Sequence, residues 1–201
     1  MKDIKEVSKK MTVYKILALI GEAGVGKDTL LQATLEKDPE LFEIISCTTR
    51  PPREGEVHGK NYFFCSNTEF QRKLKRDLFI ESTAFNNWFY GTSKEDLSKL
   101  RVNIGVFNPE GIVKLSKRKD VDLRVVRLRA SDEVRRERQL SRESAPNLEE
   151  IERRFAADKK DFSFLPFDYI TINNETPEDL IINAEKISRW AKLWKNQDKN
   201  K

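Results

Sequence analysis

The sequence predicts an α/β fold, in which a parallel sheet is covered by helices on both faces. Two observations lead to this prediction. Short apolar runs, typical of buried strands, alternate along the chain with longer amphipathic or charged runs that are typical of helices. The first apolar run also ends at a glycine-rich loop that opens a helix. Strands separated by helices pair in parallel, and 201 residues suffice for one such domain with small inserts.

The first half of the chain is expected to hold one strand and helix of the core, followed by a segment rich in strands. Residues 14–20 read YKILALI, a run too short to span a bilayer that ends at a glycine, as a buried strand does. A helix begins near Lys27. Further elements follow in order: strands near residues 42–45 and 62–64, a helix over 68–75 and a strand pair within 79–90, with a loop rich in Pro, Arg and Gly at 48–59.

The second half shows clear helix boundaries. An apolar strand over residues 102–107 precedes a helix that opens at Pro109, a favoured residue of the first helical turn. A strand over 123–128 leads to Ser131, which is expected to cap a charged helix through about Leu140, because acidic residues fill its first turn. After a loop come a second charged helix ending near residue 160, a strand over 169–172 and a last helix that starts with the capping pattern TPED at 176–179.

Composition and charge limit the classes of function. Hydrophobic residues make up 38% of the chain, enough for a core, while 35% charged residues and a mean hydropathy of −0.66 indicate a soluble protein. The net charge of +5 suits a protein that handles small polyanionic molecules. Since no helix carries a basic face and no aromatic platform is seen, we expect no nucleic acid partner. The charged N-terminus is unlike a signal peptide, so we expect a cytoplasmic protein with no membrane partner, either a monomer or a homo-oligomer.

The two cysteines and the single histidine give no sign of a metal site. Cys47 and Cys65 lack the spacing of metal ligands and are expected to be reduced thiols. His58 lies in a loop of Gly and Glu residues. A role as base or ligand is open, but a solvated loop residue is the favoured interpretation.

The segment GEAGVGKDT, residues 21–29, is interpreted as a phosphate-binding loop. Its glycines allow the backbone to form a nest of amide N–H groups that point at phosphate oxygens. The positive end of the helix dipole adds to this nest, and Lys27 supplies a mobile charge for the terminal phosphates of a nucleoside triphosphate. The strand before and the helix after it disfavour a surface glycine turn. The predicted donor-binding residues are Gly21, Glu22, Ala23, Gly24, Val25, Gly26, Lys27, Asp28 and Thr29.

The residue after the lysine departs from the usual motif. A Ser or Thr normally stands there and its hydroxyl contacts Mg²⁺, whereas this chain has Asp28. Thr29 is the next hydroxyl along the chain. We expect Mg²⁺ to accompany the triphosphate, held either by Thr29 or by water.

A second set of motifs indicates a family. Residues 46–64 read SCTTRPPREGEVHGKNYFF, and the segments FIE at 79–81 and YGTS at 90–93 follow. With the arginine-rich stretch at 138–154 and the run DYITIN at 168–173, this pattern closely resembles the guanylate kinase family over about residues 14–187. The resemblance implies a P-loop NTPase fold of three layers, with a small mixed-β insert that binds a nucleoside monophosphate and a helical lid. It also implies ATP and Mg²⁺ as cofactors and small-molecule nucleotides as partners.

The resemblance also divides the chain. It implies a single guanylate-kinase-like domain over residues 13–195, with the monophosphate-binding insert at about 47–96 and the lid at about 132–155. A charged extension precedes the domain at residues 1–12, and a polar tail follows it at 196–201.

Two arginines are the candidates for binding the phosphate of the acceptor. Arg50 and Arg53 flank a Pro-Pro pair that stiffens the chain, so their guanidinium groups can hold a monophosphate from two sides. By resemblance, the hydroxyl groups of Tyr62 and Tyr90 donate to the same phosphate. The alternative is that the two arginines form surface ion pairs with the glutamates of the same loop.

Glu81 is the candidate reader of the base. In the family resemblance its carboxylate accepts hydrogen bonds from guanine N1–H and from the exocyclic amine at once, because a carboxylate is acceptor-only. Adenine offers an acceptor at N1 and would be rejected. The resemblance adds the hydroxyl groups of Ser46 and Thr92 to the guanine pocket. The alternative for Glu81 is an exposed charge on an edge strand.

Arginines of the predicted lid are the candidates for stabilising the transferred phosphoryl group. Arg135, Arg138 and Arg142 stand at i, i+3 and i+7 and share one helix face. Because glutamates interleave them, Arg135 and Arg136 are interpreted as parts of a solvated charged surface. By motif position, the resemblance assigns Lys27, Arg138, Arg142 and Arg154 to catalysis, with Arg153 as an alternative to Arg154, and Asn173 to the donor nucleotide.

The chain departs from the family at Val106 and Asn108. These residues stand where the family has the two carboxylates of an Asp-x-Asp motif. By resemblance, one of these positions lies near the acceptor nucleoside and the other helps to hold water on Mg²⁺. Either the role has passed to another residue such as Asp28 or Glu110, or the acceptor differs, or activity is weakened.

Three functions remain as hypotheses. The leading one is an ATP-dependent guanylate kinase that transfers the γ-phosphoryl group of ATP to GMP or dGMP, giving GDP or dGDP and ADP. The second is a related P-loop kinase that acts on another (deoxy)nucleoside monophosphate or on a sugar phosphate. The third is a guanylate-kinase-like module that binds a phosphorylated partner without turnover, which the presence of Lys27 and the lid arginines disfavours.

Overall fold

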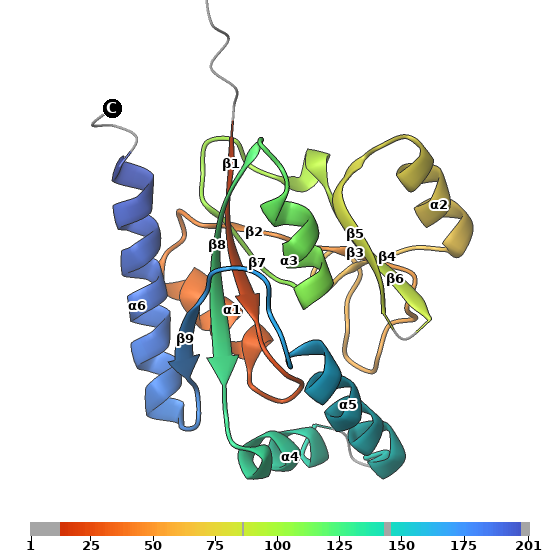
Figure 1. Ribbon diagram of the computed structural model, residues 1–201, viewed down its shortest axis with the longest axis vertical. Coiled ribbons are helices and arrows are strands. Elements are labelled where there is room, and N and C mark those ends of the chain that lie inside the picture. The colour runs from red at the N-terminus through yellow and green to blue at the C-terminus, as the bar shows by residue number, and fades with distance from the viewer. Residues whose placement is uncertain (1–12, 86, 143–145, 198–201) are drawn as a thin grey trace, which may run out of the picture.

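The structure is a computed structural model, and it describes residues 13–85, 87–142 and 146–197. The predicted N-terminal extension and most of the predicted tail lie outside the described residues. Figure 1 shows a twisted central sheet with helices on both sides and a smaller sheet next to it, which confirms the predicted α/β class. Within the described ranges, no helix has the length and apolar character needed to cross a membrane.

The central sheet has five parallel strands in the order β2–β7–β1–β8–β9. In its middle, β1 (Tyr14–Ile20) pairs with β7 (Asn103–Val106) on one side and with β8 (Val121–Arg129) on the other. The edge strands are β2 (Phe42–Glu43) and β9 (Ile170–Asn173). Because all five strands run in the same direction, the loops that follow them open at one edge of the sheet.

Alternate residues of β1 contribute to two separate cores, as a strand buried on both faces does. Leu17 and Leu19 belong to the core under helices α1 (Lys27–Lys37) and α6 (Pro177–Asn196). The intervening residues of β1 belong to a second core, under helix α3 (Pro109–Ser116). The sheet is therefore the middle of three layers.

A smaller sheet forms the predicted insert between β2 and β7. Its order is β4–β3–β6–β5, and it is mixed because β3 pairs in parallel with β4 and antiparallel with β6. Helix α2 contributes Phe70, whose ring stacks on Phe79 and Phe89 with centroids 4.6 and 5.5 Å apart. The elements of the insert are β3 (Cys47–Thr48), β4 (Phe63–Phe64), α2 (Asn67–Lys75), β5 (Phe79–Phe85), β6 (Trp88–Ser93) and the 3-10 turn η1 (Lys94–Asp96).

Helices α4 (Asp132–Leu140) and α5 (Leu148–Asp161) lie beyond the carboxyl ends of β1 and β8, at the place of the predicted lid (Figure 1). Ser131 caps α4 as predicted, with its Oγ accepting a hydrogen bond from the N–H of the third helical residue at 3.4 Å. Asn147 caps α5 in the same way at 3.0 Å. These caps satisfy N–H groups that have no partner within the helix.

Candidate active site

A cavity of about 730 Å³ lies at the carboxyl end of the central sheet, where open parallel sheets bind ligands. The loop after β1, the small sheet and helices α4 and α5 surround it. Most of the predicted site residues line this cavity: Gly21, Ala23, Gly24, Gly26, Lys27, Asp28, Thr29, Ser46, Arg50, Arg53, Tyr62, Glu81, Tyr90, Arg138, Arg142 and Arg154. Four predicted residues do not line it: Glu22, Val25, Thr92 and Asn173.

The loop between β1 and α1 has the backbone that phosphate binding requires. Gly24 and Gly26 have φ angles of 84° and 88°, in the left-handed region that favours glycine. A Cβ on Gly24 would come within 2.5 Å of the carbonyl oxygen of Arg135, so this position also has no room for a side chain. No side chain caps α1 at Gly26. The N–H groups of the first turn of α1 are therefore available to an anion.

Lys27 extends back along the loop. Its Nζ donates hydrogen bonds to the carbonyl oxygens of Gly21 at 2.7 Å and of Glu22 at 3.0 Å. Burial lowers the pKa of the Lys27 ammonium, while the charges of Asp28 and Asp158 oppose that shift. An ammonium that has lost its water in this way gains from an anionic partner such as a phosphate.

Three predicted donor-site residues point away from the cavity. Glu22 forms an ion pair with Arg127 of β8 at 2.7 Å, and Val25 is fully buried in the core. Asn173 is exposed at the end of β9, whereas the next residue, Asn174, lines the cavity. The Nδ2 of Asn174 donates to the carbonyl oxygen of Val25 at 2.8 Å. The alternation of side chains along a strand separates these two asparagines, and the sequence motif does not reveal which one faces the loop.

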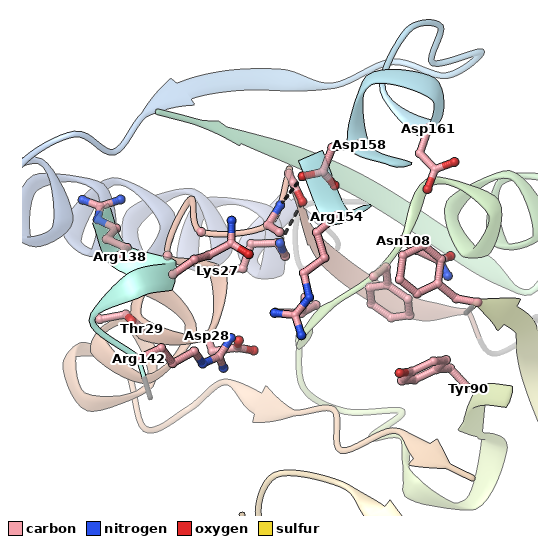
Figure 2. A pocket seen from close by; sticks show the side chains of 18 of the residues that line it. Lys27, Asp28, Thr29, Tyr90, Asn108, Arg138, Arg142, Arg154, Asp158 and Asp161 are labelled. Atoms are coloured by element: carbon pink, nitrogen blue, oxygen red, sulfur yellow. Dashed lines mark hydrogen bonds between the residues drawn. The ribbon is translucent and has the colours of Figure 1, made fainter. Parts of the chain in front are cut away.

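Arginines from three separate elements line the cavity and lie near enough for their charges to act on one another. Arg53 comes from the loop after β3, Arg142 follows α4 and Arg154 lies on α5. Burial lowers the pKa of the Arg53 guanidinium, and the charges of Arg50, Arg154 and Arg142 lower it further. Figure 2 shows Arg154 between Lys27 at one end and Tyr90 at the other. These like charges attract anions to this part of the cavity, although carboxylates such as Glu150 and Asp158 also line it.

The lid arginines have different partners. Arg138 donates through both Nη atoms to backbone carbonyl oxygens of the segment after β9, at 2.8 and 2.9 Å, so it is fixed beside the phosphate loop. Arg154 donates through Nε to Glu150 at 2.8 Å and is 18% exposed. Arg153 binds the same glutamate but does not line the cavity. Of the two alternatives, Arg154 is the one that the structure places at the cavity.

Arg135 does not belong to a solvated surface, so that prediction was wrong. Its side chain is 7% exposed, Nη2 binds Asp158 of α5 at 2.6 Å and Nε donates to the carbonyl oxygen of Ala23 at 3.0 Å. The pattern of charges along α4 cannot show which side of the helix packs on the phosphate loop. Arg136 is 45% exposed and pairs with Glu152 of α5, as a solvated residue does.

Arg50 and Arg53 line the end of the cavity that lies on the small sheet. The Nη2 of Arg50 donates to both carboxylate oxygens of Glu56, at 2.9 and 2.8 Å. An ion pair of this kind was the alternative prediction for Arg50, but with side chains 9% and 14% exposed it forms part of the cavity wall and not of the surface. Burial raises the pKa of Tyr62 to about 12, so its hydroxyl stays a donor. The ring of Tyr90 lies 6.1 Å from that of Tyr62.

Glu81 is buried, which removes the alternative of an exposed edge charge. It is 7% exposed, and its Oε1 accepts a hydrogen bond from the hydroxyl of Thr92 at 2.7 Å. Thr92 thus acts behind Glu81 and not at the cavity surface. Burial raises the pKa of the Glu81 carboxyl to about 7. Hydrogen-bond donors from a ligand would favour its charged form.

Both polar atoms of the Asn108 side chain form hydrogen bonds within the protein. Its Oδ1 accepts from the N–H of Gly111 at 2.8 Å and so caps α3, while Nδ2 donates to the hydroxyl of Thr83 at 2.9 Å. Of the two acidic residues considered as substitutes for the missing carboxylates, Glu110 pairs with a lysine of α3 at 2.6 Å and does not line the cavity. Asp28 does line it.

Several residues of the cavity wall escaped the sequence analysis, among them Thr83, Phe85, Trp88, Asp158, Asp161 and Asn174. Phe85 ends β5 and Trp88 begins β6, and both aromatic residues line the cavity. Two aromatic residues that flank the consecutive asparagines at 86 and 87 in the sequence were the available signal for this pair. No signal distinguishes Asp158 from the other acidic residues of α5.

Oxygen ligands suited to Mg²⁺ are present beside the phosphate loop. Asp28 and Thr29 are exposed to the cavity at the start of α1, and Mg²⁺ prefers few protein oxygens together with phosphates and water. The described part of the chain contains no group of three or more His, Cys, Asp or Glu residues that could hold a metal by itself. Cys47 and Cys65 are free thiols and His58 is exposed, as expected. The donor set therefore fits a metal ion that arrives with a nucleotide.

Comparisons with known proteins agree with this geometry. The family model described as guanylate kinase matches residues 13–188. A guanylate kinase of Nostoc is 44% identical over 81 residues, which span less than half of each protein, 40% of this chain and 41% of the relative. A guanylate kinase of Caldanaerobacter subterraneus is 32% identical over 186 residues, or 85% of this chain and 87% of the relative. The crystal structure of guanylate kinase from Anaplasma phagocytophilum has a similar fold, with a TM-score of 0.67 over 92% of this chain and 87% of that one, at 24% identity.

Proposed function

The chain belongs to the guanylate kinase family, and from this membership we propose that it transfers the γ-phosphoryl group of ATP to GMP or dGMP, giving ADP and GDP or dGDP. One observation carries the proposal. A single cavity is lined by the phosphate loop with Lys27, by the buried carboxylate of Glu81 from the small sheet and by arginines of three elements, and Figure 2 shows Arg154 between Lys27 and Tyr90. A donor triphosphate and an acceptor monophosphate can therefore meet end to end.

The phosphate-loop end is suited to the donor. The uncapped first turn of α1 offers N–H groups to the phosphates, and Lys27 adds a charge that can follow the transferred group. Arg138 and Asn174 are fixed beside the loop by their bonds to backbone carbonyl oxygens. ATP is the proposed donor, and Mg²⁺ bound with it neutralises charge on the phosphates, with Asp28 and Thr29 as the protein oxygens within its reach.

The end on the small sheet is suited to a guanine monophosphate. Arg50 and Arg53 provide guanidinium groups, and Tyr62 and Tyr90 provide hydroxyl donors for its phosphate. Glu81, backed by Thr92 and buried, would accept the two hydrogens that guanine presents along one edge. Ser46 lines the same end, where the resemblance places a hydroxyl of the base pocket.

Transfer between the two ends requires mainly position and positive charge. Phosphoryl transfer involves little covalent chemistry from the protein, so the guanidinium groups of Arg53, Arg142 and Arg154 would stabilise negative charge on the moving group. Helix α5 carries Arg154, and Arg142 follows helix α4; residues of both helices line the cavity. We assign Lys27, Arg138, Arg142 and Arg154 to this step.

A second acceptor class is supported by the neighbourhood of Asn108. Val106 and the Asn108–Thr83 pair line the cavity without a negative charge, beside Glu81. A kinase of this fold that acts on another (deoxy)nucleoside monophosphate or on a sugar phosphate would differ at such positions. A phosphate-binding module without turnover is disfavoured, because it has no need of Lys27 and of arginines that meet between two sites.

The test is an ADP-release assay with ATP, Mg²⁺ and a panel of ribo- and deoxyribonucleoside monophosphates and sugar phosphates. We expect turnover with GMP or dGMP to exceed that with every other acceptor. Turnover that is fastest with another monophosphate would replace the acceptor but keep the kinase. If ATP binds but no acceptor is phosphorylated, the enzyme proposal fails in favour of the binding module.

A further inference from the structure

Arg135 and Asp158 enclose one residue of the phosphate loop, and the proposed transfer assigns no role to either. The Oδ2 of Asp158 accepts hydrogen bonds from the N–H of Ala23 at 2.9 Å and from Nη2 of Arg135 at 2.6 Å. The Nε of Arg135 donates to the carbonyl oxygen of Ala23 at 3.0 Å. The N–H and the C=O of Ala23 are thus both bound by this pair, which we call the Ala23 clasp. Figure 2 shows Asp158 reaching from its helix toward the loop that leads to Lys27.

The clasp is buried between three elements. The side chains of Arg135 and Asp158 are 7% and 13% exposed, and the guanidinium lies 4.4 Å from the ring centroid of Phe155. Next to the clasp the loop touches the backbone of α4, since a Cβ on Gly24 would lie 2.5 Å from the Arg135 carbonyl oxygen. An ion pair this buried adds little net stability compared with apolar residues of similar size. Stability alone therefore does not account for it.

The position of Ala23 indicates what the clasp does. Ala23 directly precedes Gly24, the first of the two left-handed glycines, and Gly24, Gly26 and Lys27 all line the cavity. A rotation of the Ala23 peptide would change the direction of the loop N–H groups that follow it. The two side chains of the clasp come from α4 and α5, the helices that also carry Arg138 and Arg154. One buried network thus joins the loop to both helices of the lid.

We propose that Arg135 and Asp158 are positioning residues that hold the Ala23 peptide, and through it the phosphate loop, in register with the arginines of α4 and α5. The inference rests on the proposed use of the loop for ATP. It assigns the pair to donor phosphate binding and to the alignment of the donor for transfer, and it assigns it no part in acceptor binding. A displacement of the loop by about 1 Å is enough to slow a reaction that depends on the position of its reactants.

The two members of the clasp have unequal roles toward a triphosphate. Asp158 lines the cavity, and its charge would repel phosphates if Arg135 did not offset it. Removal of Arg135 leaves a carboxylate that faces the donor site. Removal of Asp158 leaves a guanidinium that still binds the Ala23 carbonyl oxygen and Asp132. We therefore expect Arg135→Leu to weaken ATP binding more than Asp158→Ala does.

The experiment compares four variants with a matched control. The variants are Arg135→Leu, Asp158→Ala, Asp158→Asn and the double variant Arg135→Leu/Asp158→Ala. The control is Arg136→Ala/Glu152→Ala, which removes an exposed ion pair between the same two helices without touching the loop. For each protein, ATP affinity is measured by calorimetry without acceptor, followed by kcat, both KM values and the thermal midpoint.

We expect the double variant to keep a thermal midpoint close to that of the wild type, because apolar residues replace a buried ion pair. Its Kd for ATP should rise at least about tenfold and its kcat should fall, while the acceptor KM stays within about twofold. Asp158→Asn keeps an acceptor for the Ala23 N–H and should recover part of the loss seen with Asp158→Ala. The control should change none of these values.

Three results would overturn the proposal. A double variant with native ATP affinity and turnover would reduce the clasp to packing. If the control variant lost as much ATP affinity and turnover, the Ala23 clasp would matter only as a contact between α4 and α5. An acceptor KM that rises as much as the Kd for ATP would mean that the whole cavity is disturbed. If Arg135→Leu or Asp158→Ala does not fold, the double variant and Asp158→Asn decide the question. Because ATP is titrated without acceptor, failure of GMP as a substrate would count against the proposed function and not against the clasp.

Discussion

Replacement of Glu81 by glutamine is expected to raise stability and to lower activity at the same pH. Burial raises the pKa of the Glu81 carboxyl to about 7 from its ordinary value of 4.5. The folded protein therefore binds more protons than the unfolded chain between these two values, and its free energy of unfolding falls as the pH rises through this range. Above a pH of about 7 this loss of stability is complete. Since each unit of pKa difference corresponds to about 1.36 kcal/mol, the loss amounts to roughly 3 kcal/mol.

Glutamine has nearly the same shape and cannot ionise. Glu81→Gln should therefore differ little from the wild type in stability near pH 5, where the buried carboxyl is protonated, and exceed it near pH 8 by up to roughly 3 kcal/mol. For a chain of this size that difference corresponds to several degrees in the thermal midpoint. Thermal unfolding of both proteins across this pH range measures it.

Activity should change in the opposite direction. The pH dependence of kcat/KM reports the pKa values of the free enzyme, so kcat/KM for GMP should rise as Glu81 ionises near pH 7. Glu81→Gln should abolish this rise and weaken GMP use sharply, because an amide cannot accept both guanine hydrogens. The preference over AMP should shrink as well. Initial rates with guanine, adenine, thymine and cytosine monophosphates at several pH values test these points.

Glu110→Gln is the matched control, since Glu110 is a neighbouring acidic residue that is 54% exposed and does not line the cavity. The charge of Glu110 is the last and smallest of the causes that act on the Glu81 pKa, so Glu110→Gln should shift the pH dependence of stability and activity only slightly and should keep the guanine preference. A wild type without guanine preference, or a Glu81→Gln variant that is less stable than the wild type near pH 8, would refute the reasoning. Glu81 would then not combine the two roles argued for it, which are recognition of guanine and burial of a charge without a cationic partner.

Three further predictions concern the rest of the cavity. Lys27→Ala should lower kcat by orders of magnitude with little change in the thermal midpoint; near-native turnover would remove the kinase assignment. Arg50→Ala and Arg53→Ala should each raise the acceptor KM by about 30-fold, from a charge-assisted contact worth about 2 kcal/mol, and leave the KM for ATP unchanged. Only Arg50→Ala should also lower the thermal midpoint, because it leaves the partly buried Glu56 without its guanidinium partner, whereas Arg53 lies among like charges. Asn108→Ala removes the cap of α3 and should lower the free energy of unfolding by about 1 kcal/mol in urea titrations, an effect that Asn108→Asp should not share.

Much of the fold could be predicted because its signals are local. The apolar run of β1 and the glycines after it define a buried strand and the start of a helix, and Ser131 and Pro109 fix where α4 and α3 begin. β3 was missed, and β2 is shorter than expected. A strand of two residues, such as β2 or β3, is too short to show the alternation of apolar and polar residues that reveals a strand in a sequence. Such strands exist only because distant partners supply their hydrogen bonds.

The site was predictable where a motif fixes both residue type and direction, and not where packing fixes the direction. The phosphate loop and the residues around Arg50 came from spacing that permits few alternatives. Arg135 and Asp158 look like any charged residues of an exposed helix until α4 and α5 are placed on the loop. Asn173 and Asn174 differ only in the face of the strand end on which they lie. Burial of a charge depends on tertiary contacts, which a single sequence does not contain.

Two arginines of the cavity already have carboxylate partners, and this limits how phosphates can bind. Arg50 is paired with Glu56, and Arg154 with Glu150. Arg153 and then Arg154 hold the pKa of Glu150 at about 2, so this carboxylate stays charged at any physiological pH. A substrate phosphate must therefore compete with Glu150 for Arg154. The contribution of Arg154 to phosphate affinity is the difference in free energy between its pair with phosphate and its pair with Glu150. In return, the carboxylates keep neighbouring arginines from repelling one another, so the cavity can hold them in place before the phosphates arrive. Preorganised charge of this kind lowers the barrier to transfer more than it strengthens substrate binding.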